Sequence, residues 1–334
     1  MTIGWYVHHH GAGHLTRMLA VRSHLDEDVV VLSSLDEPAS LPARTRWVQL
    51  PRDDEGFTGP VGGVSAPPSA DATVGGLLHW APLGHAGHRS RLARLAEVAR
   101  DEALAAMVVD VSVEVTLFSR LLGVPTVVFT QPGDRTDEPH RLAYRAATAI
   151  IAPWPEGVLP DAALLPVRDK VRWVGGISRA DPEAARAADA TGGVVLLGPQ
   201  PGLDRAGLRL AARVAGLEYS ELGTSAETWT DDPAPALAAA RVVVSAAGQN
   251  SVADVAAAGT LVILVPQDRP FDEQAAAAEA LERLGLAVVA HDAHEPASWA
   301  ALIDRALALQ PDWPLWQVSG AARRAADRIR EVAS

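Results

Sequence analysis

Short apolar segments of strand length alternate along the whole chain with longer segments whose apolar residues repeat at helical spacing. The expected strands are residues 3–7, 29–32, 47–50, 107–109, 126–129 and 149–152, then 194–197, 217–220, 242–245, 261–265 and 287–290. Strands that are apolar on both faces and alternate with helices are typical of parallel sheets covered on both sides. The sequence therefore predicts an α/β fold with two doubly wound domains.

The expected helices lie between these strands, and a region rich in proline and glycine separates the two domains. The expected helices include residues 15–25, 89–105, 113–122, 203–214, 251–258 and 271–284, and one more spans 313–332. Proline and glycine gather between residues 153 and 181, where they interrupt regular structure. We therefore expect domains at residues 1–165 and 183–311, a linker at 166–182 and a terminal segment at 312–334.

Composition excludes several classes of function. The chain has 29 basic and 41 acidic side chains, a formal net charge of -12, and so lacks the positive surplus typical of nucleic-acid binding. It has no cysteine, which excludes disulfides and thiol nucleophiles. Its first residues do not form a signal peptide, and no run of ~18 apolar residues occurs. These features predict a cytoplasmic protein without a spanning segment.

The first expected strand ends in the loop HHHGAGHLTR, residues 8–17. Gly11 and Gly13 allow a tight turn and a close approach of ligand. His14 falls at the start of the next helix, where the positive helix end disfavours the charged imidazole and leaves the ring able to accept a proton. Two alternatives stay open, a metal site among the histidines and a plain turn with a capping histidine. A dinucleotide fingerprint is excluded because Thr16 replaces its third glycine.

The strand at residues 242–245 ends in the loop AAGQNS, residues 246–251. Small residues between a parallel strand and a helix expose backbone N–H groups to an anion. Asn250 and Ser251 add side-chain donors, and Asp254 follows one turn later, where it can accept hydrogen bonds from ribose. The alternative is a plain helix capped by Ser251.

Two further loops follow expected strands. Residues 266–274 (PQDRPFDEQ) concentrate carboxylates and amides, which bind sugar hydroxyls or cap a helix. Asp110 follows the strand at 107–109, and Glu114 follows one helical turn later. These carboxylates are candidates for a base and its orienting group, and Asp110 is equally a candidate helix cap. Because ligands of open parallel sheets bind beyond the carboxyl ends of strands, we expect the site among these loops.

The loops resemble those of nucleotide-sugar glycosyltransferases of the GT-B class, in which two Rossmann-like domains face a central cleft. The resemblance covers nearly the whole chain, is strongest from residue 245 to residue 274, and points to the bacterial peptidoglycan N-acetylglucosaminyltransferase and UDP-sugar transferase families. It implies transfer of a sugar from a nucleotide-diphosphate sugar, UDP in the first place, to a hydroxyl acceptor. It further implies an inverting displacement with no cofactor and no metal ion, and a last helix that crosses back onto the first domain.

The same resemblance assigns donor roles residue by residue. Gly248, Asn250 and Ser251, in the loop that also contains Gln249, hold the diphosphate, and Asp254 holds the ribose. Glu273 and Gln274 match the pair that binds the donor sugar. Arg179 ends the segment GGISR, similar to a linker motif of the family, and neutralises the diphosphate.

On the acceptor side, the loop that contains Gly11, Gly13 and Arg17 looks like the family's Gly-His-x-x-Pro loop, with Arg17 in place of the proline. A hydroxyl acceptor needs a base near neutrality, so we predict that His14 is the catalytic base and that Asp110 is either its orienting group or its rival.

Three alternatives differ in their acceptor side. A nucleotide-sugar hydrolase or 2-epimerase needs no acceptor, and the long segment at residues 51–76 favours an enzyme that binds one. A catalytically silent binding protein keeps the donor loop without a working base.

The arginines at 323, 324, 328 and 330 offer a peripheral membrane contact, but the acidic residues among them favour an ordinary surface helix.

Overall fold

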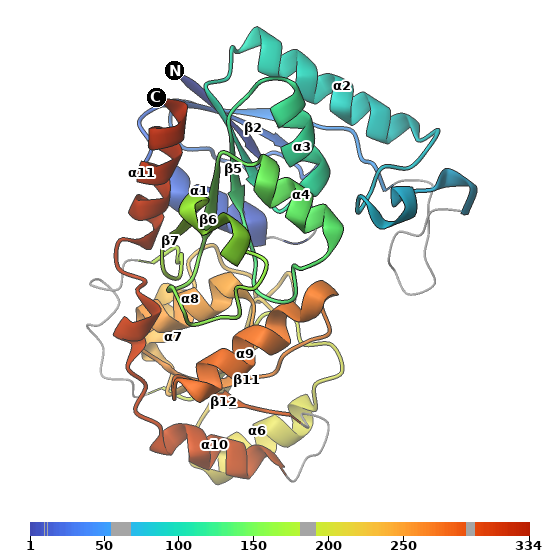
Figure 1. The fold of residues 1–334 in the computed structure, drawn as a ribbon. Helices are drawn as coiled ribbons and strands as arrows, with labels where there is room; N and C mark the ends of the chain where they lie inside the picture. The colour runs from blue at the N-terminus through green and yellow to red at the C-terminus, as the bar shows by residue number, and fades with distance from the viewer. Residues whose placement is uncertain (10, 12, 55–67, 181–191, 292–297) are drawn as a thin grey trace.

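The structure, a computed structural model, describes residues 1–9, 11, 13–54, 68–180, 192–291 and 298–334. Within these residues, two parallel sheets covered by helices lie toward opposite ends of the molecule (Figure 1). The first sheet has 7 strands in the order β3-β2-β1-β4-β5-β6-β7, and the second has 5 in the order β12-β11-β10-β8-β9. This arrangement confirms the predicted α/β fold of two doubly wound domains.

The strands of the first sheet are β1 (Thr2–Tyr6), β2 (Asp28–Ser33), β3 (Thr45–Gln49), β4 (Ala106–Asp110), β5 (Thr126–Phe129), β6 (Ala149–Ala152) and β7 (Val171–Trp173). Those of the second are β8 (Val194–Leu197), β9 (Tyr219–Leu222), β10 (Val242–Ser245), β11 (Leu261–Leu264) and β12 (Val288–Val289). The helices are α1 (Gly13–Arg22), α2 (Ala86–Asp101), α3 (Val113–Leu121), α4 (Glu138–Ala146), α6 (Arg205–Val214), α7 (Ala234–Ala239), α8 (Gln249–Ala258), α9 (Glu273–Arg283), α10 (Ser298–Ala308) and α11 (Ala321–Ala333).

The central strands are buried along their whole length because helices cover both faces of each sheet. Every residue of β4, β8 and β10 is buried, which explains their continuous apolar sequences. The loops that follow β1, β5, β10 and β11 line one cavity between the domains. The carboxyl ends of the two sheets therefore face each other. Ligands of open parallel sheets bind beyond these ends, so one site can be shared by both domains.

Two segments differ from the expectation. Residues 166–182 were expected to form a linker, but β7 within them pairs with β6 and forms the edge of the first sheet. The first domain therefore extends through Trp173. The single helix expected at 313–332 is divided into the short helix η5 (Trp313–Trp316) and α11, because Gln317 and Gly320 have positive φ angles of 52° and 71°. A residue in the left-handed region cannot continue a right-handed helix.

The two connections between the domains lie side by side. The Gly176 amide donates to the Trp316 carbonyl at 3.0 Å, which joins the outgoing chain to the returning chain. A Cβ atom on Gly175 would lie 2.2 Å from the Gln317 carbonyl oxygen, and one on Gly176 would lie 2.5 Å from the Trp316 ring. Only glycine allows this approach, so the glycine pair fixes where the chains cross.

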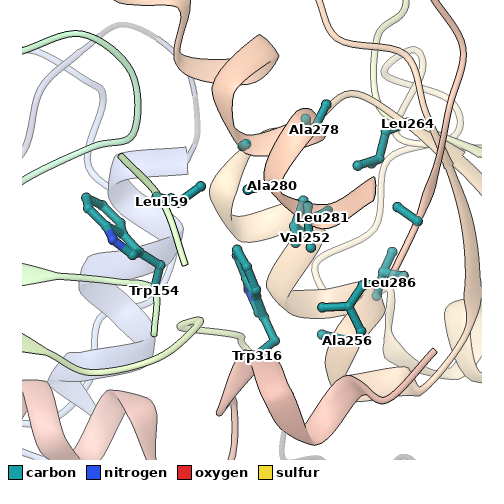
Figure 2. Close-up of a cluster of buried hydrophobic side chains, with 14 of the residues drawn as sticks. Trp154, Leu159, Val252, Ala256, Leu264, Ala278, Ala280, Leu281, Leu286 and Trp316 are labelled. Carbon is teal, nitrogen blue, oxygen red and sulfur yellow. The ribbon is translucent and has the colours of Figure 1, made fainter. Parts of the chain in front are cut away.

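A hydrophobic cluster joins the domains beside this crossing. It includes Trp154 after β6, Trp316 of η5 and the α8 residues Val252 and Ala256. Figure 2 shows the Trp316 ring lying against α8, with Trp154 on the other side toward the first domain. Both rings are almost fully buried, so the domains share part of one core.

The last helix packs on the first domain, where both chain ends lie close together (Figure 1). Ala325 and Ile329 of α11 are fully buried against Trp5 and Met18. Three of the four arginines of this helix have partners within the protein. Arg324 donates to backbone carbonyls, Arg328 pairs with Glu331, and Arg330 pairs with Asp327 and Glu27. Among the described residues, no helix combines the length and apolarity needed to cross a bilayer.

Candidate active site

A cavity of roughly 810 Å³ lies between the carboxyl ends of the two sheets. Most of the residues predicted from the sequence line it, namely Gly11, Gly13, His14, Arg17, Gly248, Gln249, Asn250, Ser251, Glu273 and Gln274. Asp110 lies directly behind His14 and Arg17, to both of which it is bonded. Arg179 and Asp254 do not line the cavity.

His14, Arg17 and Asp110 form one polar cluster at the start of α1. The Nδ1 atom of His14 lies 3.0 Å from Oδ1 of Asp110. Arg17 donates from Nε to Oδ2 at 3.2 Å and from Nη2 to Oδ1 at 2.5 Å, so it holds both oxygens of the carboxylate. β1 and β4 are neighbours in the sheet, which brings a residue after β1 to the last residue of β4.

The charge state of this cluster follows from its burial and its partners. Asp110 is fully buried, which raises the pKa of its carboxyl, but Arg17 and then His14 outweigh burial and hold that pKa at about 2. An ionised carboxylate only accepts hydrogen bonds, so His14 donates from Nδ1 to Asp110. This tautomer leaves Nε2 of His14 able to accept a proton.

The N-terminus of α8 lines the same cavity and lies next to this cluster. Gly248 is the N-cap residue, and among the residues that the structure describes no side chain caps the first turn of the helix. Ser251 lies inside that first turn, so the alternative interpretation, in which Ser251 is the N-cap, is wrong. The four residues from Gly248 to Ser251 line the cavity with the positive end of the helix dipole. An uncapped helix start of this kind is suited to bind phosphate.

Two hydrogen bonds connect the two helix starts directly. Nη1 of Arg17 donates to Oε1 of Gln249 at 2.8 Å. Nδ2 of Asn250 donates to the Gly13 carbonyl at 2.6 Å. The side chains predicted for the acceptor loop and for the donor loop are therefore in contact, and they close one edge of the cavity.

The loop after β11 contributes a third group. Gln274 is almost fully buried, and its Oε1 accepts from the Gln267 amide at 2.9 Å. Glu273 lies 3.6 Å from Arg135 of the first domain. Burial raises the pKa of the Glu273 carboxyl, opposed by Arg135 and more weakly by Arg17 and His14. The carboxyl and the neighbouring amide offer hydrogen-bond acceptors and donors to a polyhydroxylated ligand.

Arg179 and Asp254 pair with each other at the domain linker. Nη2 of Arg179 donates to Oδ2 of Asp254 at 2.8 Å, and Ser178 Oγ donates to Oδ1 at 2.7 Å. The carboxyl of Asp254 is 4% exposed, and it faces the linker rather than the cavity. The structure therefore places neither residue on the lining of the cavity, and their pairing ties α8 to the linker.

The structure also separates other groups considered from the sequence. Glu114 does not reach Asp110, since its carboxylate accepts from the amides of His79 and Trp80 at 2.8 and 3.0 Å. Among the histidines of the first loop, His9 faces Asp54 at 3.5 Å while His14 faces Asp110, so these two do not converge on one metal. His10 lies outside the described residues, as do residues 55–67 of the long segment at 51–76.

Five lining residues were missed from the sequence, namely His79, Val111, Gln131, Arg135 and His140, and Phe271 of the loop at 266–274 was given no role. The Phe271 ring reaches from the second domain onto the first, with its centre 5.4 Å from the His79 ring and 4.8 Å from the His140 ring. The Arg135 guanidinium lies 4.4 Å from the same ring, within the range of a cation–π contact. Burial lowers the pKa of His140 to about 4, although Asp137 opposes the shift.

Known proteins resemble the chain in sequence over part of its length and in fold over nearly all of it. Residues 214–311 match the glycosyltransferase family 28 C-terminal domain. Among solved structures, the chain is similar to MurG from Acinetobacter baumannii, with 18% identity, a TM-score of 0.62 and coverage of 99% of each chain. UGT2 from Phytolacca americana, complexed with UDP-2-fluoro-glucose and pterostilbene, gives 14% identity, a TM-score of 0.62 and coverage of 99% and 94%.

The spinosyn rhamnosyltransferase SpnG gives 16% identity, a TM-score of 0.60 and coverage of 99% and 97%. A comparison with curated protein sequences gave no significant match. The fold is therefore that of the GT-B class. The matched domain contains α8 and the loop after β11, and together with this fold it supports a glycosyltransferase that resembles MurG and the UDP-sugar transferases.

Proposed function

We propose that the protein transfers a sugar from a nucleotide-diphosphate sugar, with UDP as the nucleotide, to a hydroxyl group of an acceptor. One observation carries this proposal. Across a single cavity, the uncapped start of α8 faces His14, whose ring is held by the buried carboxylate of Asp110. One side of the cavity is suited to a diphosphate and the other to removal of a proton.

The donor binds along the second domain in this proposal. Its phosphates lie at Gly248, Asn250 and Ser251, where backbone N–H groups and the Ser251 hydroxyl donate to them. Glu273 and Gln274 bind hydroxyls of the donor sugar. Arg17 and Arg269, which line the same cavity, supply positive charge near the phosphates, so this step uses no metal ion.

The reaction is a single inverting displacement. Asp110 keeps His14 in the tautomer with the proton on Nδ1, and Nε2 removes the proton of the acceptor hydroxyl. The acceptor oxygen forms a bond to the anomeric carbon as the bond from that carbon to the diphosphate oxygen breaks. The leaving nucleoside diphosphate takes the electron pair, and the start of α8 stabilises its charge.

Calorimetric titration with UDP and with other nucleoside diphosphates tests the donor side. We expect one site per chain with a preference for UDP. A UDP concentration of 100 times the Kd should raise the free energy of unfolding by ~2.7 kcal/mol. We also expect donor affinity and the turnover number at saturating acceptor to persist in EDTA. Loss of both in EDTA, restored by Mg²⁺ or Mn²⁺, contradicts the metal-free donor site. Release of free sugar at the same rate without any acceptor indicates a hydrolase instead.

A further inference from the structure

A second cluster of polar side chains lies on the first-domain side of the cavity, apart from His14 and the donor loop. It consists of His79, Asp137 and His140. Nε2 of His79 lies 2.6 Å from Oδ2 of Asp137, and Nδ1 of His140 contacts Oδ1 of the same carboxylate. Asp137 and His140 are separated by one turn at the start of α4, whereas His79 comes from a segment 58 residues earlier.

The carboxylate of Asp137 does not perform the ordinary role of its position. Asp137 is the N-cap residue of α4, yet its side chain makes no capping hydrogen bond to the helix. A capping aspartate contributes about 1 kcal/mol to a helix, so turning the carboxylate away has a cost. The carboxylate faces the two imidazoles instead, with one oxygen toward each ring.

The set of donor atoms matches a divalent transition metal. The three ligand atoms lie within 4.8 Å of one another. Two imidazole nitrogens and one carboxylate oxygen are the ligands of many zinc sites, with metal–ligand distances of about 2.0–2.2 Å. We propose that His79, Asp137 and His140 bind one divalent ion of the zinc class.

This site is accessible from the cavity, because His79 and His140 both line it. Three protein ligands leave at least one coordination position to water or to an oxygen atom of a bound molecule. The Phe271 ring packs against both imidazoles from the second domain and shields them on that side. The ion therefore lies on the acceptor side of the cavity, and none of its ligands belongs to the donor loop.

Metal binding is tested directly on the full chain, first treated with a chelator and then dialysed. Titration with Zn²⁺ in competition with a chromophoric chelator should give one ion per chain, and Co²⁺ should give the visible absorption bands of a site with nitrogen and oxygen ligands. His79→Ala should weaken Zn²⁺ binding at least tenfold. This variant suits the test because the His79 side chain is 31% exposed, whereas His140 is 8% exposed and packs in the core.

Two further variants make the result decisive. Asp137→Asn keeps the size of the side chain and should also weaken Zn²⁺ binding at least tenfold. His291→Ala is the matched control, because it removes a surface histidine that pairs with the carboxylate of Glu282 at 3.3 Å and is not part of the cluster. It should leave both the stoichiometry and the affinity unchanged.

Absence of binding at micromolar Zn²⁺ overturns the inference, as does equal affinity in wild type, His79→Ala and Asp137→Asn. The three side chains then form only a hydrogen-bonded cluster. The affinity for UDP, measured in the same preparations, should not depend on Zn²⁺. A failed metal site with intact UDP binding leaves the proposed function standing. Intact Zn²⁺ binding without any nucleotide binding supports the metal site and contradicts the proposed function.

Discussion

The helices α1 and α8 are built by the same local rule and present different chemistry. Each follows a buried central strand, β1 or β10, through a short loop that contains glycine, and their starts line the same cavity. At α1, side chains occupy the helix start, where His14 and Arg17 hold the carboxylate of Asp110. At α8, the N-cap is Gly248, which has no side chain, and no other side chain of the described part of the chain caps the first turn.

The difference in capping separates the roles that the proposed function gives to the two helix starts. At α1, the neighbouring carboxylate is already bonded to side chains, and we propose that this start moves a proton. At α8, no capping side chain is found among the described residues, and we propose that this start binds an anion. The hydrogen bonds from Arg17 to Gln249 and from Asn250 to Gly13 hold the two kinds of site against each other.

The largest expected effect comes from removing the proton acceptor at α1. His14→Ala should lower kcat about 10²–10⁴-fold, which is the usual contribution of a general base. The affinity for UDP should stay within about threefold, because no donor contact is assigned to His14. Steady-state kinetics beside calorimetry of UDP binding checks both expectations. A variant that turns over within about threefold of wild type means that the base lies elsewhere.

The next effect concerns stability and its dependence on pH. The pKa of Asp110 is about 2 in the folded protein and about 3.9 in an unfolded chain, so the unfolded state binds more protons in acid. The charged cluster therefore adds roughly 2–3 kcal/mol to the free energy of unfolding above about pH 5. That contribution is lost as the pH falls toward 2.

Denaturant unfolding of wild type and Asp110→Asn between pH 5 and pH 2 checks this window. Asparagine keeps the shape of the side chain and removes its charge, so the difference in unfolding free energy between the two proteins should shrink as the pH falls. A difference that stays constant over this range contradicts the assignment of the charge to Asp110.

Much of the fold was predictable because periodicity is a local property of the sequence. Continuous apolar segments such as 126–129, 149–152 and 242–245 match β5, β6 and β10 at both ends. β7 was missed because its sequence, VRW, is short and only partly buried, which is typical of an edge strand. The break before α11 depends on Gln317, a residue whose positive φ no sequence pattern signals.

The site was predictable where it depends on strand ends and not where it depends on distant partners. The rule that ligands bind beyond strand ends led to His14, Asp110 and the start of α8. Applied to the loop after β5, the same rule would have led to Arg135. A clue in that loop is Gly133, where a Cβ atom would lie 2.0 Å from the Phe271 carbonyl oxygen. The pairing of Arg179 with Asp254, 75 residues apart, depends on the path of the linker and leaves no local pattern.

At α8, the expected effect of one substitution is smaller than at His14. In the proposed donor site, Ser251→Ala removes a hydroxyl that donates to a charged phosphate, a bond worth about 1.5–3 kcal/mol. We therefore expect kcat/KM for the donor to fall roughly 10- to 100-fold. The backbone N–H groups of the helix start remain in place, so donor binding should weaken without disappearing. Unchanged kcat and donor KM in this variant contradict the phosphate site at α8.

The smallest effect on the donor is expected one turn further along the same helix. Asp254→Asn removes a carboxylate that is bonded to Ser178 and Arg179 at the linker and does not line the cavity. The melting temperature should fall, because Arg179 loses its partner, while the affinity for UDP should change less than about threefold. Calorimetry of UDP binding, with Ser251→Ala as the matched variant on the cavity side, separates the two roles. A loss of tenfold or more in Asp254→Asn would mean that this carboxylate does reach the ribose, and that the linker pair opens when the donor binds.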